Sequence, residues 1–139
     1  MEPTALAPLP IELTLLGATL ILAIVQILLA AVARTRQYGR SWNMGARDEA
    51  MPPLDPVPGR LLRAQDNLME TLPLFAAAVL AAAVAGRLGF KTSLGAHLYF
   101  FARLVYLPLY WAGLPVVRTL VWTVSLAGLV SVIAGLFLV

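Results

Sequence analysis

Long apolar runs separated by short polar connections make up almost the whole chain. Four of these runs are predicted to be membrane-spanning helices, at about residues 10–33, 66–86, 92–112 and 116–138. A helix needs roughly 20 apolar residues to cross about 30 Å of hydrocarbon, and each run approaches or exceeds that length. The pattern therefore predicts a single all-α domain over residues 1–139, an integral membrane four-helix bundle without a soluble module.

Composition agrees with this pattern and excludes several kinds of chemistry. Hydrophobic residues make up 60% of the chain and charged residues 12%, against roughly 25% charged residues in soluble domains. The chain has no cysteine and one histidine, which excludes disulfides, a cysteine nucleophile and a multi-histidine metal site within one chain. The net charge of +3 comes from scattered basic residues, so we expect a lipid bilayer and no nucleic acid as partner.

The connection at about 34–62 is the only long one and determines the predicted topology. It contains the proline-rich stretch MPPLDPVPG, and proline disfavours helix at the residues before it. It also carries more basic residues than any other connection: Arg34, Arg36, Arg40, Arg47 and Arg60. Basic loops stay on the cytoplasmic side. We therefore expect this loop to be cytoplasmic and both termini to lie on the opposite face.

Polar side chains at membrane depth are the main functional signal. Sixteen residues separate Glu70 from Arg87, about 24 Å of helix, so a spanning helix must take Glu70 below the membrane surface. Eleven uncharged residues separate Lys91 from Arg103, which places Arg103 about 17 Å into the membrane. Since a lipid-facing arginine there costs several kcal/mol, Arg103 should face protein or water and have a partner.

The polar residues also share helix faces. At 100° per residue, one face of the second helix carries Arg60, Arg63, Asn67 and Glu70, and one face of the third carries Tyr99, Arg103, Tyr106 and Tyr110. Their depths match, so the two stripes could meet in one pocket in the cytoplasmic half of the bundle. Its arginines, amide, carboxylate and phenols would suit a small zwitterionic ligand with carboxylates and an amine.

Each group also has a purely structural interpretation. Glu70 and Arg103 could pair only to stabilise helix packing, and Arg60 and Arg63 could be interfacial anchors. Tyrosines near helix ends are typical of aromatic belts, and Gln26 is expected to hold helices together. The two stripes together favour a binding pocket more than any single member does.

Two stretches carry a family resemblance: RAQDNLMETLPLF, and FARLVYLPLYWAGLPVVRT after it. Together they resemble the MAPEG family, the membrane-associated proteins in eicosanoid and glutathione metabolism. The loop segment ARDEAMPPLDP is similar to that of the bacterial members. The resemblance extends from Arg34 to the fourth helix and implies a protein of the bacterial inner membrane.

The resemblance implies a homotrimer of four-helix subunits with glutathione bound between neighbours near the cytoplasmic face. By position, the residues that resemble the family's glutathione-binding residues are Arg34, contributed by a neighbour, and Arg63, Asn67, Glu70, Arg103, Tyr106 and Tyr110. Arg118 resembles the arginine that activates the glutathione thiol, and with Tyr106 it is the candidate catalytic residue. Asp66 departs from the pattern of prostaglandin E synthase, which has an arginine at that place.

The implied function is a glutathione-dependent membrane transferase or peroxidase. A cation near the sulfur favours thiolate over thiol, and the thiolate then attacks a lipophilic electrophile or peroxide dissolved in the membrane. A non-catalytic membrane subunit with the same fold is the alternative. A small oligomeric transporter is a third interpretation, which the apolar stretch LFAAAVLAAAVAG disfavours because a continuous pore needs polar residues at many depths.

Overall fold

Four long helices run side by side in the computed structural model, which describes residues 5–138. Its elements in chain order are α1 (Ile11–Tyr38), α2 (Arg40–Met44), α3 (Pro56–Val84), α4 (Phe90–Ala112) and α5 (Pro115–Phe137). The described residues contain no strand, so the all-α prediction is confirmed. The long helices α1, α3, α4 and α5 match the four apolar runs, and the short α2 is the fifth helix. Residues 1–4 and 139 of the expected domain lie outside the described part.

The connection expected at 34–62 is shorter in the structure and partly helical. Helix α1 continues to Tyr38 and ends at Gly39, whose φ of 96° suits glycine. Helix α3 begins at Pro56, because proline is well tolerated in the first helical turn, where its missing N–H is not needed. The predicted connection was too long because the end of an apolar run marks where lipid contact ends, whereas the backbone hydrogen bonds of the helix continue beyond it.

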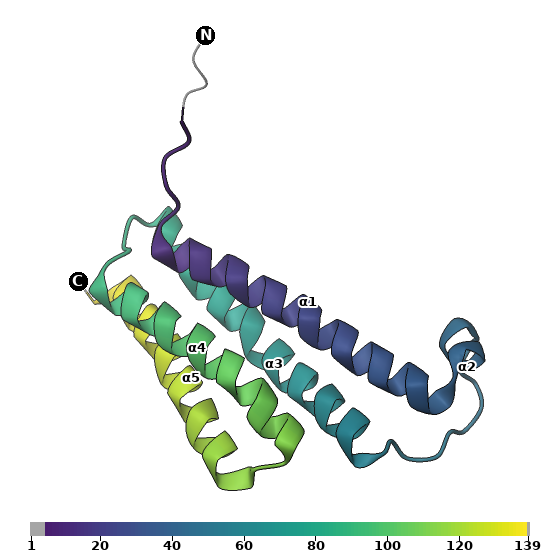
Figure 1. Cartoon of the computed structure of the whole chain (residues 1–139). Helices are drawn as coiled ribbons and strands as arrows, with labels where there is room; N and C mark the ends of the chain where they lie inside the picture. Colours follow the sequence, from purple (N-terminus) through teal and green to yellow (C-terminus); the bar gives the residue numbers. More distant parts are fainter. Residues whose placement is uncertain (1–4, 139) are drawn as a thin grey trace.

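The ends of the helices gather at two ends of the bundle (Figure 1). The start of α1, the turn between α3 and α4, and the end of α5 lie at one end. The end of α1, α2 and the turn between α4 and α5 lie toward the other. The described ends of the chain therefore share one end of the bundle, as four crossings require, and which membrane face that end meets stays a prediction.

Helices α4 and α5 pack most closely, because two glycines face each other. A Cβ atom on Gly128 would lie 2.7 Å from the carbonyl oxygen of Gly95 and 2.7 Å from the amide nitrogen of Tyr99. Small residues allow membrane helices to approach to backbone contact. The close α4–α5 pair fixes the start of α5 beside the end of α4.

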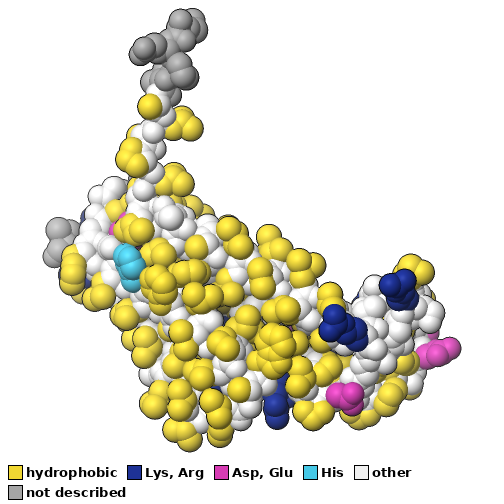
Figure 2. Space-filling model, viewed as in Figure 1, with side chains coloured by type: hydrophobic (Ala, Val, Ile, Leu, Met, Phe, Trp, Pro, Cys, Tyr) yellow, Lys and Arg dark blue, Asp and Glu magenta, His cyan; other side chains and the backbone are white. Residues whose placement is uncertain are grey.

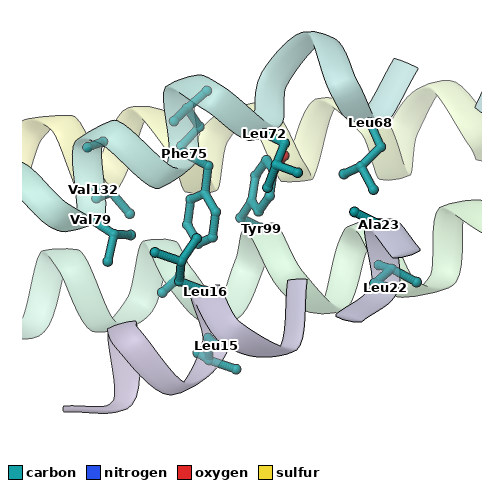
Figure 3. Close-up of a cluster of buried hydrophobic side chains, with 13 residues drawn as sticks. Leu15, Leu16, Leu22, Ala23, Leu68, Leu72, Phe75, Val79, Tyr99 and Val132 are labelled. Carbon is teal, nitrogen blue, oxygen red and sulfur yellow. The ribbon is translucent and has the colours of Figure 1, made fainter. Parts of the chain in front are cut away.

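The apolar core joins α1, α3, α4 and α5 in the half of the bundle away from α2 (Figure 3). Phe75 of α3 and Tyr99 of α4 stack with ring centroids 4.0 Å apart, and Val79 and Val132 pack in the same cluster with no exposed surface. This packing holds α3 against α4. It therefore sets the relative position of the polar residues of these two helices that lie nearer to α2.

Apolar side chains cover much of the face shown in Figure 2, and each of the four long helices exposes large hydrophobic residues. In the described part of the chain, α1, α3 and α5 are long and apolar enough to cross a membrane. Helix α4 has 23 residues, which is sufficient length, but it carries Lys91, His97 and Arg103. Its crossing as a fourth span stays a prediction.

Candidate functional site

The polar stripes of α3 and α4 face each other in the half of the bundle toward α2. The hydroxyl oxygen of Tyr110 accepts a hydrogen bond of 3.2 Å from Nε of Arg63. One turn deeper, Oδ1 of Asn67 accepts a hydrogen bond of 2.8 Å from Nη1 of Arg103. Four of the expected site residues are thus paired across the α3–α4 interface.

Arg103 is enclosed within the single chain, with 0% of its surface exposed. Its guanidinium carbon lies 4.6 Å from the centroid of the Tyr106 ring, a cation–π distance. Its Nε and Nη2 atoms have no hydrogen-bond partner within the described residues. The expected partner is present, but it is the amide of Asn67 that accepts a hydrogen bond from Arg103 and not the exposed carboxylate of Glu70.

The contact with Arg103 determines what Asn67 can offer a ligand. An amide has one oxygen that accepts and one NH₂ group that donates. Because Oδ1 of Asn67 faces the guanidinium, its Nδ2 group is left as the donor, and the half-buried side chain remains partly accessible. Asn67 is therefore suited to a carbonyl or carboxylate oxygen.

Tyr110 brings a third helix to the site. The guanidinium carbon of Arg118, from the first turn of α5, lies 4.4 Å from the centroid of the Tyr110 ring. That of Arg63 lies 6.0 Å from the same centroid. The rings of Tyr106 and Tyr110 meet edge to face, with centroids 5.5 Å apart. Tyr110 thus lies close to two cations, one from α3 and one from α5.

Arg60 has a mainly structural position. Its Nη1 donates a hydrogen bond of 3.3 Å to the carbonyl oxygen of Trp111, in the last turn of α4, where helix carbonyls lack intrahelical partners. A Cβ atom at Gly113, which has a φ of 76°, would lie 2.8 Å from the Arg60 guanidinium carbon. Sequence reasoning missed Trp111 and Gly113 because a backbone carbonyl and a close approach leave no side-chain pattern.

In the described part of the chain, two other expected polar residues form no hydrogen bond with this contact set. The hydroxyl of Tyr99 is 2.8 Å from that of Thr71, and Tyr99 is fully buried, which makes it a packing residue of the core. Thr71 follows Glu70 directly but was not singled out from the sequence. Arg34 is half-buried on α1, and its Nε has no hydrogen-bond partner among the described residues.

The assembled site is an open, positively charged face of the subunit. Arg63 and Glu70 are exposed, and Asn67, Tyr110 and Arg118 are half-buried. Arginines outnumber carboxylates in this set, because the two polar stripes and Arg118 supply Arg60, Arg63, Arg103 and Arg118 but only one carboxylate, Glu70. Such a face favours an anionic ligand. The described residues contain no group of three His, Asp or Glu side chains able to hold a metal ion.

Comparison with known families agrees with this arrangement. The model of the MAPEG family matches residues 15–138, which include every helix that contributes to the site. Comparisons with curated proteins and with solved structures found no match. The match covers nearly the whole chain, and the protein therefore belongs to the MAPEG family of membrane proteins in glutathione and eicosanoid metabolism.

Proposed function

We propose that the protein is a glutathione-dependent membrane transferase or peroxidase that acts on lipophilic electrophiles. The observation that carries this proposal is the convergence of α3, α4 and α5 on Tyr110, which lies close to both Arg63 and Arg118. In a family of glutathione metabolism, a cationic face with an amide donor and one carboxylate suits a tripeptide that has two carboxylates, an amine and a thiol.

Binding in this proposal uses the exposed part of the face. Arginine forms bidentate, charge-assisted hydrogen bonds with carboxylates, which is the role we assign to Arg63 and to Arg34 from a neighbouring subunit. Glu70 is available for the amine, and Nδ2 of Asn67 for a carbonyl or carboxylate oxygen. Arg103 is enclosed, so it acts on the ligand through Asn67.

The chemistry requires a cation beside the sulfur, a role we assign to Arg118. A guanidinium near a thiol favours the thiolate, because opposite charge stabilises the ionised form. The thiolate supplies the nucleophile that forms a bond to the electrophilic carbon or peroxide oxygen, while the leaving group departs with its electron pair. Tyr106, next to Tyr110, offers a hydroxyl that can donate a proton or hydrogen bond to that leaving group.

We further propose that the active form is a homotrimer. The site is open in one subunit, and Arg34 lies on a different helix from the other proposed ligand-binding residues. A neighbouring subunit that covers the face would supply Arg34 and exclude lipid from the polar groups.

The test is glutathione binding to the purified protein by calorimetry, followed by turnover with an aryl halide and with a lipid hydroperoxide. Saturable binding and turnover of either substrate are expected. Binding without turnover of any electrophile would overturn the catalytic assignment in favour of a non-catalytic subunit. Absence of glutathione binding would overturn the proposed site.

A further inference from the structure

Helices α1 and α4 each carry a row of three buried polar residues at seven-residue spacing. None of the six side chains exposes more than 4% of its surface. They are Glu12, Thr19 and Gln26 on α1, and Thr92, Tyr99 and Tyr106 on α4. Seven residues are close to two helical turns, so each row stays on one face. The rows meet at Glu12 and Thr92, while Tyr99 also contacts Thr71 and Phe75 of α3. We call the two rows together the α1–α4 seam.

One hydrogen bond fixes the register of this seam. Oγ of Thr92 donates to Oε1 of Glu12 at 2.6 Å. Helices α1 and α4 run in the same direction from that contact (Figure 1). Gln26 and Tyr106 each follow fourteen residues after their member of the pair, so both lie about 21 Å further along. Gln26 is thus level with the enclosed half of the functional site.

The same register places Arg103 at about the height of Gln26. Arg103 follows Thr92 by eleven residues, which is about 17 Å along α4 and about 20° from the direction of Thr92. Gln26 is about 40° from the direction of Glu12 on α1 by the same count. The two side chains therefore lie within one helical turn in height, and each points within about 40° of the residue of its own helix that makes the Glu12–Thr92 contact.

Their unused hydrogen-bonding atoms are complementary. Gln26 is 1% exposed, and neither Oε1 nor Nε2 has a hydrogen-bond partner in the described part of the chain. Two donor atoms of Arg103, Nε and Nη2, are also buried without a hydrogen-bond partner among the described residues. Leaving a buried polar group unpaired costs about 1–3 kcal/mol, and more for a charged group. An amide oxygen opposite two guanidinium donors would remove that cost for both.

We propose that Gln26 is a positioning residue, whose amide oxygen accepts from the Arg103 guanidinium, across at most one water molecule. Gln26 would then hold Arg103 in the orientation in which Nη1 donates to Asn67, and so fix the Asn67 amide with its donor group toward the ligand. The first link of this proposal is the contact between Gln26 on α1 and Arg103 on α4, and it is independent of the reaction. The last link is the effect of Asn67 on the ligand, and it rests on the proposed glutathione site.

The first link is tested by thermal unfolding of the purified protein in detergent. Gln26→Glu should unfold at least as high as wild type, because the carboxylate gains the enclosed cation, whereas Gln26→Leu should unfold lower. In the Arg103→Met background the order should reverse, since Gln26→Glu then buries an unpaired charge. Arg103→Gln, which also removes the charge, serves as a second background if Arg103→Met does not fold.

The matched control is Gln65→Glu on α3, which makes the same isosteric change. Gln65 is two residues from Asn67, about 200° around the helix, so it faces away from Arg103. Its effect on unfolding should be the same in both backgrounds. If Gln26→Glu destabilises the protein more than Gln26→Leu does, or shows no dependence on Arg103, Gln26 does not face the guanidinium and the proposal is overturned.

The last link is tested by glutathione titration. Gln26→Leu should weaken binding about tenfold, the typical effect of one lost hydrogen bond to a charged group, and Gln26→Glu should restore most of the affinity. Equal affinity in Gln26→Leu and wild type would overturn the positioning role. Wild type that does not bind glutathione would overturn the proposed function and this last link, whereas the unfolding series alone decides the contact between Gln26 and Arg103.

Discussion

At the scale of single residues, Arg118 separates chemistry from binding. Its guanidinium stacks on Tyr110 at the start of α5, whereas the proposed carboxylate and amine contacts lie on α3 and on a neighbouring α1. Arg118→Ala should therefore abolish the thiolate absorbance of bound glutathione, below the ordinary thiol pKa of about 8.5, and slow turnover at nearly unchanged affinity. Arg118→Lys should restore only part of the thiolate signal and turnover, because lysine lacks the planar guanidinium group with its paired donors.

The control for that experiment is Arg87→Ala, which removes an exposed cation at the other end of the bundle. It should leave the thiolate signal and turnover as in wild type. An active enzyme in which Arg118→Ala behaves like wild type would disprove the assignment.

Asn67 and Glu70 belong to the binding part of the same site. Asn67→Ala and Glu70→Gln should each weaken glutathione binding about ten- to a hundredfold, the effect of losing one charge-assisted hydrogen bond of about 1.5–3 kcal/mol. Asp66→Asn is the matched control, since Asp66 is exposed on α3 but off the stripe. If instead affinity holds and the assembly dissociates, both residues are structural.

At the scale of helices, the approach of α4 to α5 positions Arg118 and depends on glycine. Gly128→Ala would place a methyl group against the Gly95 carbonyl and the Tyr99 amide, and this overpacking should cost about 1–3 kcal/mol of unfolding free energy. Gly17→Ala is the control. Gly17 lies within α1 with no neighbouring atom within 4 Å of its Cβ position, so alanine there should be neutral or slightly stabilising. Thermal unfolding in detergent compares the two, and equal effects would contradict the close-packing argument.

At the scale of the whole molecule, the proposed trimer places Arg34 and Arg63 of one site on different subunits. Arg34→Ala and Arg63→Ala should each weaken glutathione binding, and cross-linking in mild detergent should give trimers. Refolded or co-expressed mixtures of the two variants should regain some high-affinity sites, because one interface then combines both native arginines. Only monomers on cross-linking, or mixtures without recovery, would show that the site lies within one subunit.

The sequence alone determined the four long helices and the need to enclose Arg103. Apolar runs of membrane length predicted the four long helices, because lipid offers the backbone no hydrogen-bond partners and a helix satisfies its backbone groups internally. Depth along α4 required that Arg103 avoid lipid, and it is fully buried. The motif in α3 and α4 also indicated the family before any contact was known. These features depend only on the order of residues along a single helix, which can be read directly from the sequence.

Only the tertiary structure decided which groups meet. Helical periodicity gives the face and depth of each residue, but not how far neighbouring helices rotate and shift against each other, because many small packing contacts set that arrangement jointly. That is why the partner of Arg103 is Asn67 rather than Glu70, and why Arg60 bonds to a backbone carbonyl of α4. The same reason explains Arg118: its place over Tyr110 follows from the glycine contact between α4 and α5, which no pattern within a single helix contains.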